Sequence, residues 1–206
     1  MNTSFAKASN PVCRSDSAAG CAVVLATAAR SSSLPRRHTL RVVLFDGEER
    51  SLAGSRAWVA GLAVEERRRV LALVNLDLVG WNAAPSGAVL LHPVRISGAL
   101  PLPPAWLAHA ALRAGRAVEA PLAVASTRFS PLAQLIARAF QPTLVSDAEA
   151  ALAGGIPALT LSEADLFVAY PQHHGAGDDG GRLLEPRLDL WTLRLGAIVR
   201  RLDSLA

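Results

Sequence analysis

Short apolar runs alternate with longer amphipathic or alanine-rich segments along most of this chain. The runs have the length of about four to eight residues expected of strands buried on both faces. They lie at 40–45, 70–76, 89–94, 118–125 and 156–161. The segments between them predict helices at 18–30, 56–63, 65–69, 103–116, 130–140 and 188–202. Strands that alternate with helices indicate an α/β fold, here a three-layer sandwich with a mostly parallel central sheet.

Composition narrows the class of protein. The chain has 206 residues, of which 51% are hydrophobic, enough for one domain with a full core. The formal net charge is +4, but the arginines are scattered rather than gathered in one stripe, so we expect no nucleic-acid partner. The longest apolar run near the N-terminus, 20–29, is too short to span a bilayer and has no basic flank before it. We therefore expect neither a membrane span nor a signal peptide in this chain.

Ionisable residues follow three of the apolar runs. Carboxylates come after 40–45 and 70–76, imidazoles and carboxylates come after 156–161, and one more carboxylate precedes the first helix. These residues are Asp46, Glu48, Glu49, Asp77, His173, His174, Asp178, Asp179 and Asp16. The carboxyl ends of parallel strands share one edge of a sheet, where ligands bind in open α/β folds. So many carboxylates would repel one another without a cation, and this ligand chemistry suits Zn²⁺.

The adjacent pair Glu48-Glu49 is the most informative feature of this set. One carboxylate of such a pair can bind the metal while its neighbour takes a proton from water that the metal activates. The alternative is an ordinary polar loop, and the position of the pair after a buried strand, within F-D-G-E-E, favours the catalytic reading.

Five segments then resemble one family, in the same order. Asp16-Ser17-Ala18-Ala19-Gly20 resembles D-N-x-S-G, and residues 45–55 resemble F-D-G-E-E-x-G-L-x-G-S. Residues 75–80 resemble N-L-D-M-V-G, residues 146–147 with 155–158 resemble S-D-H…G-I-P-A, and His174 with Asp178 resembles H-T-P-x-D. These are motifs of the co-catalytic zinc aminopeptidases, bacterial leucyl-aminopeptidase-like enzymes related to transferrin receptor and glutaminyl cyclase. The resemblance covers the chain from Asp16 onward.

The resemblance implies a role for each matching residue. Glu48 would be the general base, and Asp16, Glu49, Asp77 and His174 would be metal ligands, with Asp16 bridging two zinc ions. Asp178 would fix the tautomer of the imidazole, while His173 and Asp147 are further candidates, His173 being either a substitute ligand or a solvated neighbour. The substrate would be a peptide or aminoacyl compound. The family is often secreted or periplasmic, so the compartment of this chain stays open.

The match fails at the start of the family's pattern. An earlier H-x-D segment should supply a histidine to the second zinc, yet only fifteen residues precede Asp16 and none is histidine. We therefore expect 1–15 to be a disordered or mis-started segment, and 16–206 to be a catalytic domain that lacks its first strands. His38, His92 and His109 lie at no ligand position of the family. Ser51 replaces a glycine and Ala148 replaces a histidine.

Two consequences follow from the missing segment. Asp16, Glu49 and His174 still form a complete set of three ligands, so one tight zinc site is expected, with a second site that is weak or absent. A sheet without its first strands also exposes an edge, which a partner or an oligomer would cover.

Two other functions remain open. One is a glutaminyl-peptide cyclotransferase that uses one zinc, because Asp16-Ser17-Ala18-Ala19 with Cys21 resembles its D-S-A-x-x-C-A segment and Asp178-Asp179 resembles its paired aspartates. The segments at 52–55 and 75–80 favour the peptidase over the cyclase. The other is an inactive truncated product or pseudoenzyme that serves as a binding module.

Overall fold

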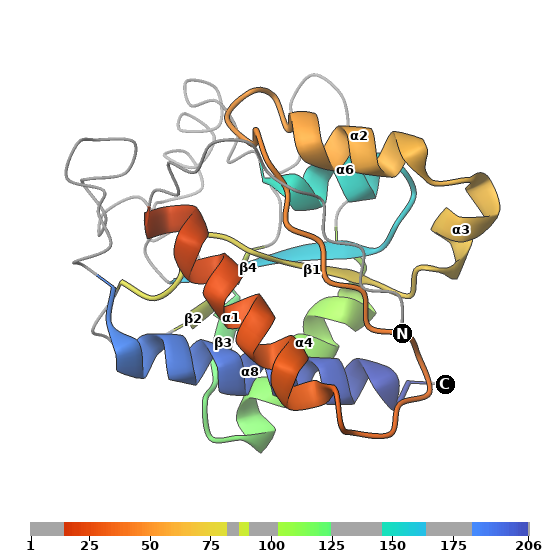
Figure 1. The fold of residues 1–206 in the computed structure, drawn as a ribbon. Helices are drawn as coiled ribbons and strands as arrows, with labels where there is room; N and C mark the ends of the chain where they lie inside the picture. Colours follow the sequence, from red (N-terminus) through yellow and green to blue (C-terminus); the bar gives the residue numbers. More distant parts are fainter. Residues whose placement is uncertain (1–14, 82–86, 91–102, 125–145, 164–182, 206) are drawn as a thin grey trace, which may run out of the picture.

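A four-stranded sheet lies between two sets of helices (Figure 1). The computed structural model describes residues 15–81, 87–90, 103–124, 146–163 and 183–205. The strands are β1 (Leu73–Leu76), β2 (Gly87–Leu90), β3 (Leu122–Val124) and β4 (Ala158–Glu163), in the order β1-β4-β2-β3. β1 is parallel to β4 and β2 to β3, whereas β2 and β4 are antiparallel. The predicted α/β class with a mostly parallel sheet is thereby confirmed.

One face of the sheet is covered by α1 (Ser15–Ser31), α4 (Ala105–Ala117) and α8 (Glu185–Asp203). α8 packs against both α1 and α4, and its Trp191 and Ile198 are fully buried together with Leu107 of α4. The many alanines of α4 allow it to pack closely on α8 and on the sheet, because small side chains let helices pack tightly against a sheet.

The opposite face carries α2 (Ala53–Gly61) and α6 (Asp147–Ala153), which pack on each other and on the sheet. Leu52, Val59, Leu152 and Ile156 form the core of this layer. The short α3 (Val64–Arg69) follows α2 and has no fully buried residue. Arg68 and Arg69 are exposed, as expected from their glutamate neighbours, whereas Arg67 is half-buried.

Side chains of β4 alternate between the two layers. Leu159 and Leu161 join the core under α8, whereas Ala158 joins the core under α2 and α6. This period of two places Glu163 on the α8 side and Thr160 on the α6 side. All six residues of β4 are buried, as befits a strand with neighbours on both sides.

Most predicted helices are confirmed, with ends that shift by a few residues. The predicted strands at 70–76, 118–125 and 156–161 are also found, starting two to four residues later, at 73, 122 and 158. β2 begins at residue 87 rather than 89, and the remainder of its predicted range, 91–94, lies outside the described residues, as does the predicted helix at 130–140. The helix α6 was not predicted, because seven residues are too few to show a clear helical period.

The predicted strand at 40–45 is wrong. These residues have no regular secondary structure, and Leu44 is 46% exposed. β1 lies at the end of the strand order and pairs with β4 alone, so 40–45 does not add to its open edge and forms no ladder with any described strand. An apolar run alone therefore does not make a strand, because a strand requires a partner for its backbone groups.

No helix in the described parts of the chain is long and apolar enough to cross a membrane.

Candidate active site

A tight loop before α2 positions the two adjacent glutamates. The backbone N–H of Leu52 donates to the carbonyl of Glu48 at 2.8 Å, and that of Gly54 donates to the carbonyl of Asp46 at 2.9 Å. Gly47 has a φ of 69°, which a glycine adopts without strain. A Cβ on Gly54 would lie 2.3 Å from the carbonyl oxygen of Asp46, so no larger residue fits there.

This loop gives the two carboxylates different surroundings. Glu48 is half-buried, whereas Glu49 is exposed. The buried side chain of Leu52 anchors the end of the loop in the core shared by α2 and α6, and Phe45 packs edge-to-face on Trp58 of α2, with 5.7 Å between ring centroids. The loop is therefore fastened to α2 on both sides of the glutamates.

Asp77 lies where the sequence places it, directly after β1. Its backbone N–H donates to the carbonyl of Leu161 in β4 at 3.0 Å, which continues the parallel pairing by one residue. The chain then turns sharply, with Leu78 at φ 51° and Gly80 at φ 96°. Asp77 thus stands at the carboxyl edge of the sheet, where a ligand is expected.

The start of α1 lies close to the same point. Gly20 packs so tightly on β1 that a Cβ there would lie 3.1 Å from the carbonyl oxygen of Leu76. Asp16 precedes Gly20 by about one helical turn, or about 6 Å along the axis. The first turns of α1 therefore approach the end of β1, which Asp77 follows.

Asp147 begins α6 and contacts the first turn of α2. Burial raises the pKa of its carboxyl group, and the side-chain hydrogen bond from Ser55 opposes that rise in part. Its Oδ1 is buried and has no hydrogen-bond partner among the described residues. The preceding Ser146 shares a 2.6 Å hydrogen bond with Thr160 of β4. Ser55, which the sequence did not indicate as a partner, thus ties Asp147 to the helix that follows the glutamates.

The described side chains do not by themselves form a metal site. Among them, no three histidine, cysteine, aspartate or glutamate residues come close enough to hold a metal ion. The side chain of Asp16, and all of His173, His174 and Asp178, lie outside what the structure describes. The remaining expected donors, Glu49 and Asp77, are oxygen ligands that suit zinc, and the approach of α1 to the end of β1 fits a bridging aspartate.

The other described histidines lie elsewhere. His38 contacts Asp203 at the end of α8, with its backbone N–H 2.8 Å from the carboxylate. The backbone N–H of His38 lowers the pKa of Asp203 most, and that of Arg37 adds to the effect. His109 lines an open cleft of about 520 Å³, whose walls combine apolar Leu71, Trp106 and Leu205 with Arg113 and Arg201. Leu71 precedes β1 and Leu205 follows α8, so this cleft lies at the end of the sheet opposite Asp77.

One buried polar cluster was missed by the sequence analysis. Glu163, at the end of β4, is fully buried and is paired with Arg187 of α8. Burial, followed by repulsion from Arg187, lowers the pKa of Arg194 to about 10, while Glu163 opposes that change. The signal was available, because Glu163 follows an apolar run just as Asp77 does, two residues beyond the predicted end of the strand.

The fold is similar to those of solved aminopeptidases. The aminopeptidase from Aneurinibacillus sp. strain AM-1 is 24% identical, with a TM-score of 0.68 over 89% of this chain and 38% of that one. The zinc aminopeptidase BSAP from Bacillus subtilis is 20% identical, with a TM-score of 0.68 over 90% of this chain and 41% of that one. The LapA aminopeptidase from Legionella pneumophila is 18% identical, with a TM-score of 0.69 over 92% and 47%. The chain therefore has the α/β fold of these aminopeptidases and spans less than half of their length.

The model of peptidase family M28 matches residues 12–189. The chain belongs to peptidase family M28, which confirms the family indicated by the five motifs. No match was found among the curated proteins.

Proposed function

We propose that this chain is the catalytic core of a metal-dependent aminopeptidase. The observation that carries the proposal is the Glu48-Glu49 pair, which a closed loop holds at the start of α2 in a member of a peptidase family. The hydrogen-bonded turn around Gly47 and Gly54 holds the backbone of both glutamates at the start of α2, and catalysis requires reacting groups in fixed positions. The substrate class is a peptide or another aminoacyl compound.

The metal ligands follow from the resemblance and from the backbone. Asp16, Glu49 and His174 would hold one zinc, and Asp77 with Asp16 would form a weaker second site. The contact of Gly20 with the end of β1 supports the pairing of Asp16 and Asp77. When bound, zinc supplies a Lewis acid that polarises the scissile carbonyl and lowers the pKa of water to roughly 7.

Glu48 is assigned the proton transfer. Its carboxylate would accept a proton from the attacking water and pass it to the nitrogen of the departing amine, so that one oxygen atom acts first as base and then as acid. Its half-buried position limits competition from bulk solvent. Glu49, the next residue, would bind the metal, so the two adjacent glutamates would have different roles.

The test is release of the anilide product from a leucyl anilide with added zinc, comparing the parent chain with Glu48→Gln. The substitution keeps the shape of the side chain but removes the base, so turnover should fall by about 10²–10⁴-fold. Equal rates in the two proteins would reject Glu48 as the base.

The cyclotransferase is the second candidate, because the D-S-A-x-x-C-A resemblance and the single complete ligand set both suit it. Cyclisation of a glutaminyl peptide by a parent chain that leaves leucyl anilide intact would favour the cyclase. A folded parent chain that is silent on both substrates would favour an inactive binding module.

A further inference from the structure

The loop that carries Asp77 contacts β4 and the residue just before α8. The backbone N–H of Glu163 donates to the carbonyl of Leu78 at 3.2 Å, and that of Leu184 donates to the carbonyl of Gly80 at 2.8 Å. Trp81 closes the loop on itself, with its indole Nε1 donating to the carbonyl of Leu78 at 3.0 Å. The left-handed backbone at Leu78 costs about 1–2 kcal/mol, so these contacts maintain a conformation that the loop does not favour alone.

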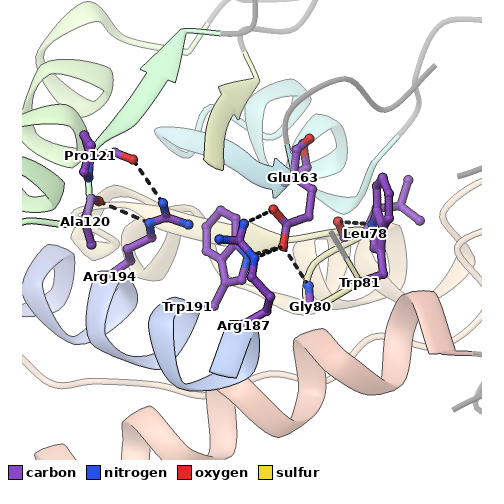
Figure 2. Close-up of polar contacts among 10 residues, drawn as sticks. Leu78, Gly80, Trp81, Ala120, Pro121, Glu163, Arg187, Trp191 and Arg194 are labelled. Atoms are coloured by element: carbon purple, nitrogen blue, oxygen red, sulfur yellow. Dashed lines mark hydrogen bonds and ion pairs between the residues drawn. The ribbon is translucent and has the colours of Figure 1, made fainter. Parts of the chain in front are cut away.

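Glu163 is the centre of this arrangement (Figure 2). Its Oε1 accepts from the backbone N–H of Gly80 at 3.1 Å, from Nε of Arg187 at 3.2 Å and from Nε1 of Trp191 at 2.8 Å. Its Oε2 is paired with Nη2 of Arg187. One carboxylate thus joins the loop after β1 to the first turns of α8.

Gly80 permits this contact because it has no side chain. Its φ of 96° suits glycine, and a Cβ there would lie 2.6 Å from Cδ2 of Leu188 in α8. The loop therefore sits directly against α8. Because Gly80 has no side chain, the backbone can come close enough for the N–H of Gly80 to point at Glu163. The glycine of the N-L-D-x-V-G motif accordingly has a physical reason in this chain.

We infer that Glu163 is a positioning residue for Asp77: it fixes the loop at 77–81 so that the Asp77 carboxylate faces the metal site. The inference rests on the proposed function for the role of Asp77. Glu163 itself lies on the α8 side of β4 and takes no part in the chemistry. A buried acceptor that orders a ligand-bearing loop acts as outer-shell groups do in metal sites, where its loss lowers metal affinity by about 10–100-fold.

Arg194 supplies a matched control. It is buried in the same helix, stacks on Trp191 with 4.8 Å to the ring centroid, and donates to the carbonyls of Ala120 and Pro121 at 3.1 Å. Figure 2 shows these contacts on the far side of Trp191 from Gly80. Arg194 touches the Glu163 cluster only through Trp191 and through charge, so Arg194→Met should reduce stability and alter the loop at 77–81 much less than the loss of Glu163 does.

The experiment compares the parent chain with the double variant Glu163→Met/Arg187→Leu and with Arg194→Met. Replacing both members of a buried ion pair by apolar residues usually preserves folding, whereas Glu163→Met alone would leave a buried charge. Hydrogen exchange is measured at the amides of 77–81, and Co²⁺ titration is followed by its visible absorption. Asp77→Ala identifies the component of cobalt binding that depends on Asp77.

In the double variant, exchange at Gly80 should be at least ten-fold faster, and the Asp77-dependent cobalt affinity should fall by about 10–100-fold. Arg194→Met should change both much less. Unaltered exchange at Gly80 in the double variant, or an equal change in Arg194→Met, would overturn the inference. A parent chain without an Asp77-dependent component would instead refute the metal role of Asp77, and the exchange data would still decide whether Glu163 holds the loop.

Discussion

Ser51 and Leu52 both adopt left-handed backbone conformations just before α2, with φ of 60° and 61°. A residue with a Cβ pays about 1–2 kcal/mol for this conformation, whereas glycine adopts it freely. Position 51 is one of the places where the sequence departs from the family motif, which has glycine there. This departure has a physical consequence. The loop that follows Glu48 and Glu49 keeps the left-handed backbone that suits glycine, but position 51 carries a side chain.

Ser51→Gly should therefore raise the free energy of unfolding by about 1 kcal/mol. Urea denaturation measures the change. Ser33→Gly, at an exposed serine in the turn after α1 whose φ is not positive, is the control and should give no gain. A Ser51→Gly protein no more stable than the parent would contradict the strain at this position.

Asp147 should make stability depend on pH. Because burial raises the pKa of this carboxyl in the folded chain, the folded state binds the proton more tightly than the unfolded state, and stability falls as pH rises through the window between the two pKa values. Asp147→Asn should remove that loss, so the variant should be more stable than the parent at pH 7 and equal to it below about pH 3.5. Asp189→Asn, on the exposed side of α8, is the control.

Chemical denaturation at pH 3.5, 5 and 7 would show the trend. A stability advantage of Asp147→Asn that is the same at every pH would contradict the assigned cause.

A helix or strand of this fold could be predicted where its side-chain pattern agrees with the neighbours that it packs on or pairs with. The helix at 18–30 and the helix at 188–202 were found, because each has a long apolar face and ends in basic residues. The run at 40–45 has the side chains of a strand but no neighbour in the described sheet, and its sequence could not show that. The sequence likewise gave no sign that Asp203 in α8 would bind the backbone N–H groups of Arg37 and His38 at distances of 2.8–3.1 Å.

The junction between the glutamate loop and α2 depends on one close backbone approach. Gly54→Ala would place a Cβ 2.3 Å from the carbonyl oxygen of Asp46, and the loop must open to relieve it, so we expect a loss of about 1–3 kcal/mol together with lower turnover. Gly61→Ala, in the same helix, meets nothing within 4 Å and should be close to neutral. Thermal unfolding and the anilide assay measure both variants. Equal effects at the two glycines would show that the approach at Gly54 is unimportant.

Across the whole molecule, the carboxyl end of β1 carries Asp77, and the Glu48-Glu49 loop lies just before α2. That the other expected ionisable residues gather at the same edge stays a prediction. Asp77 was placed correctly after its strand, because a residue that directly follows a strand is fixed by local sequence. The Glu48-Glu49 loop was placed correctly before a helix but not after a strand, because residues 40–45 form none. Glu163 could have been singled out as an acidic residue after an apolar run, but its partners could not. The roles of Glu163, Ser55 and Arg187 depend on contacts across 24 to 92 positions. The expected partner or oligomer at the outer edge of β1 stays a prediction, as does the number of zinc ions.

The central claim is that Glu49 binds the metal while Glu48 moves the proton. The measurement is the rise in melting temperature on adding zinc to the parent chain, Glu48→Gln and Glu49→Ala. Zinc at 100 times its dissociation constant adds about 2.7 kcal/mol, or several degrees for a chain of this length. We expect that rise in the parent and in Glu48→Gln, and its loss in Glu49→Ala. A full zinc response in Glu49→Ala, or none in the folded parent, would contradict the account.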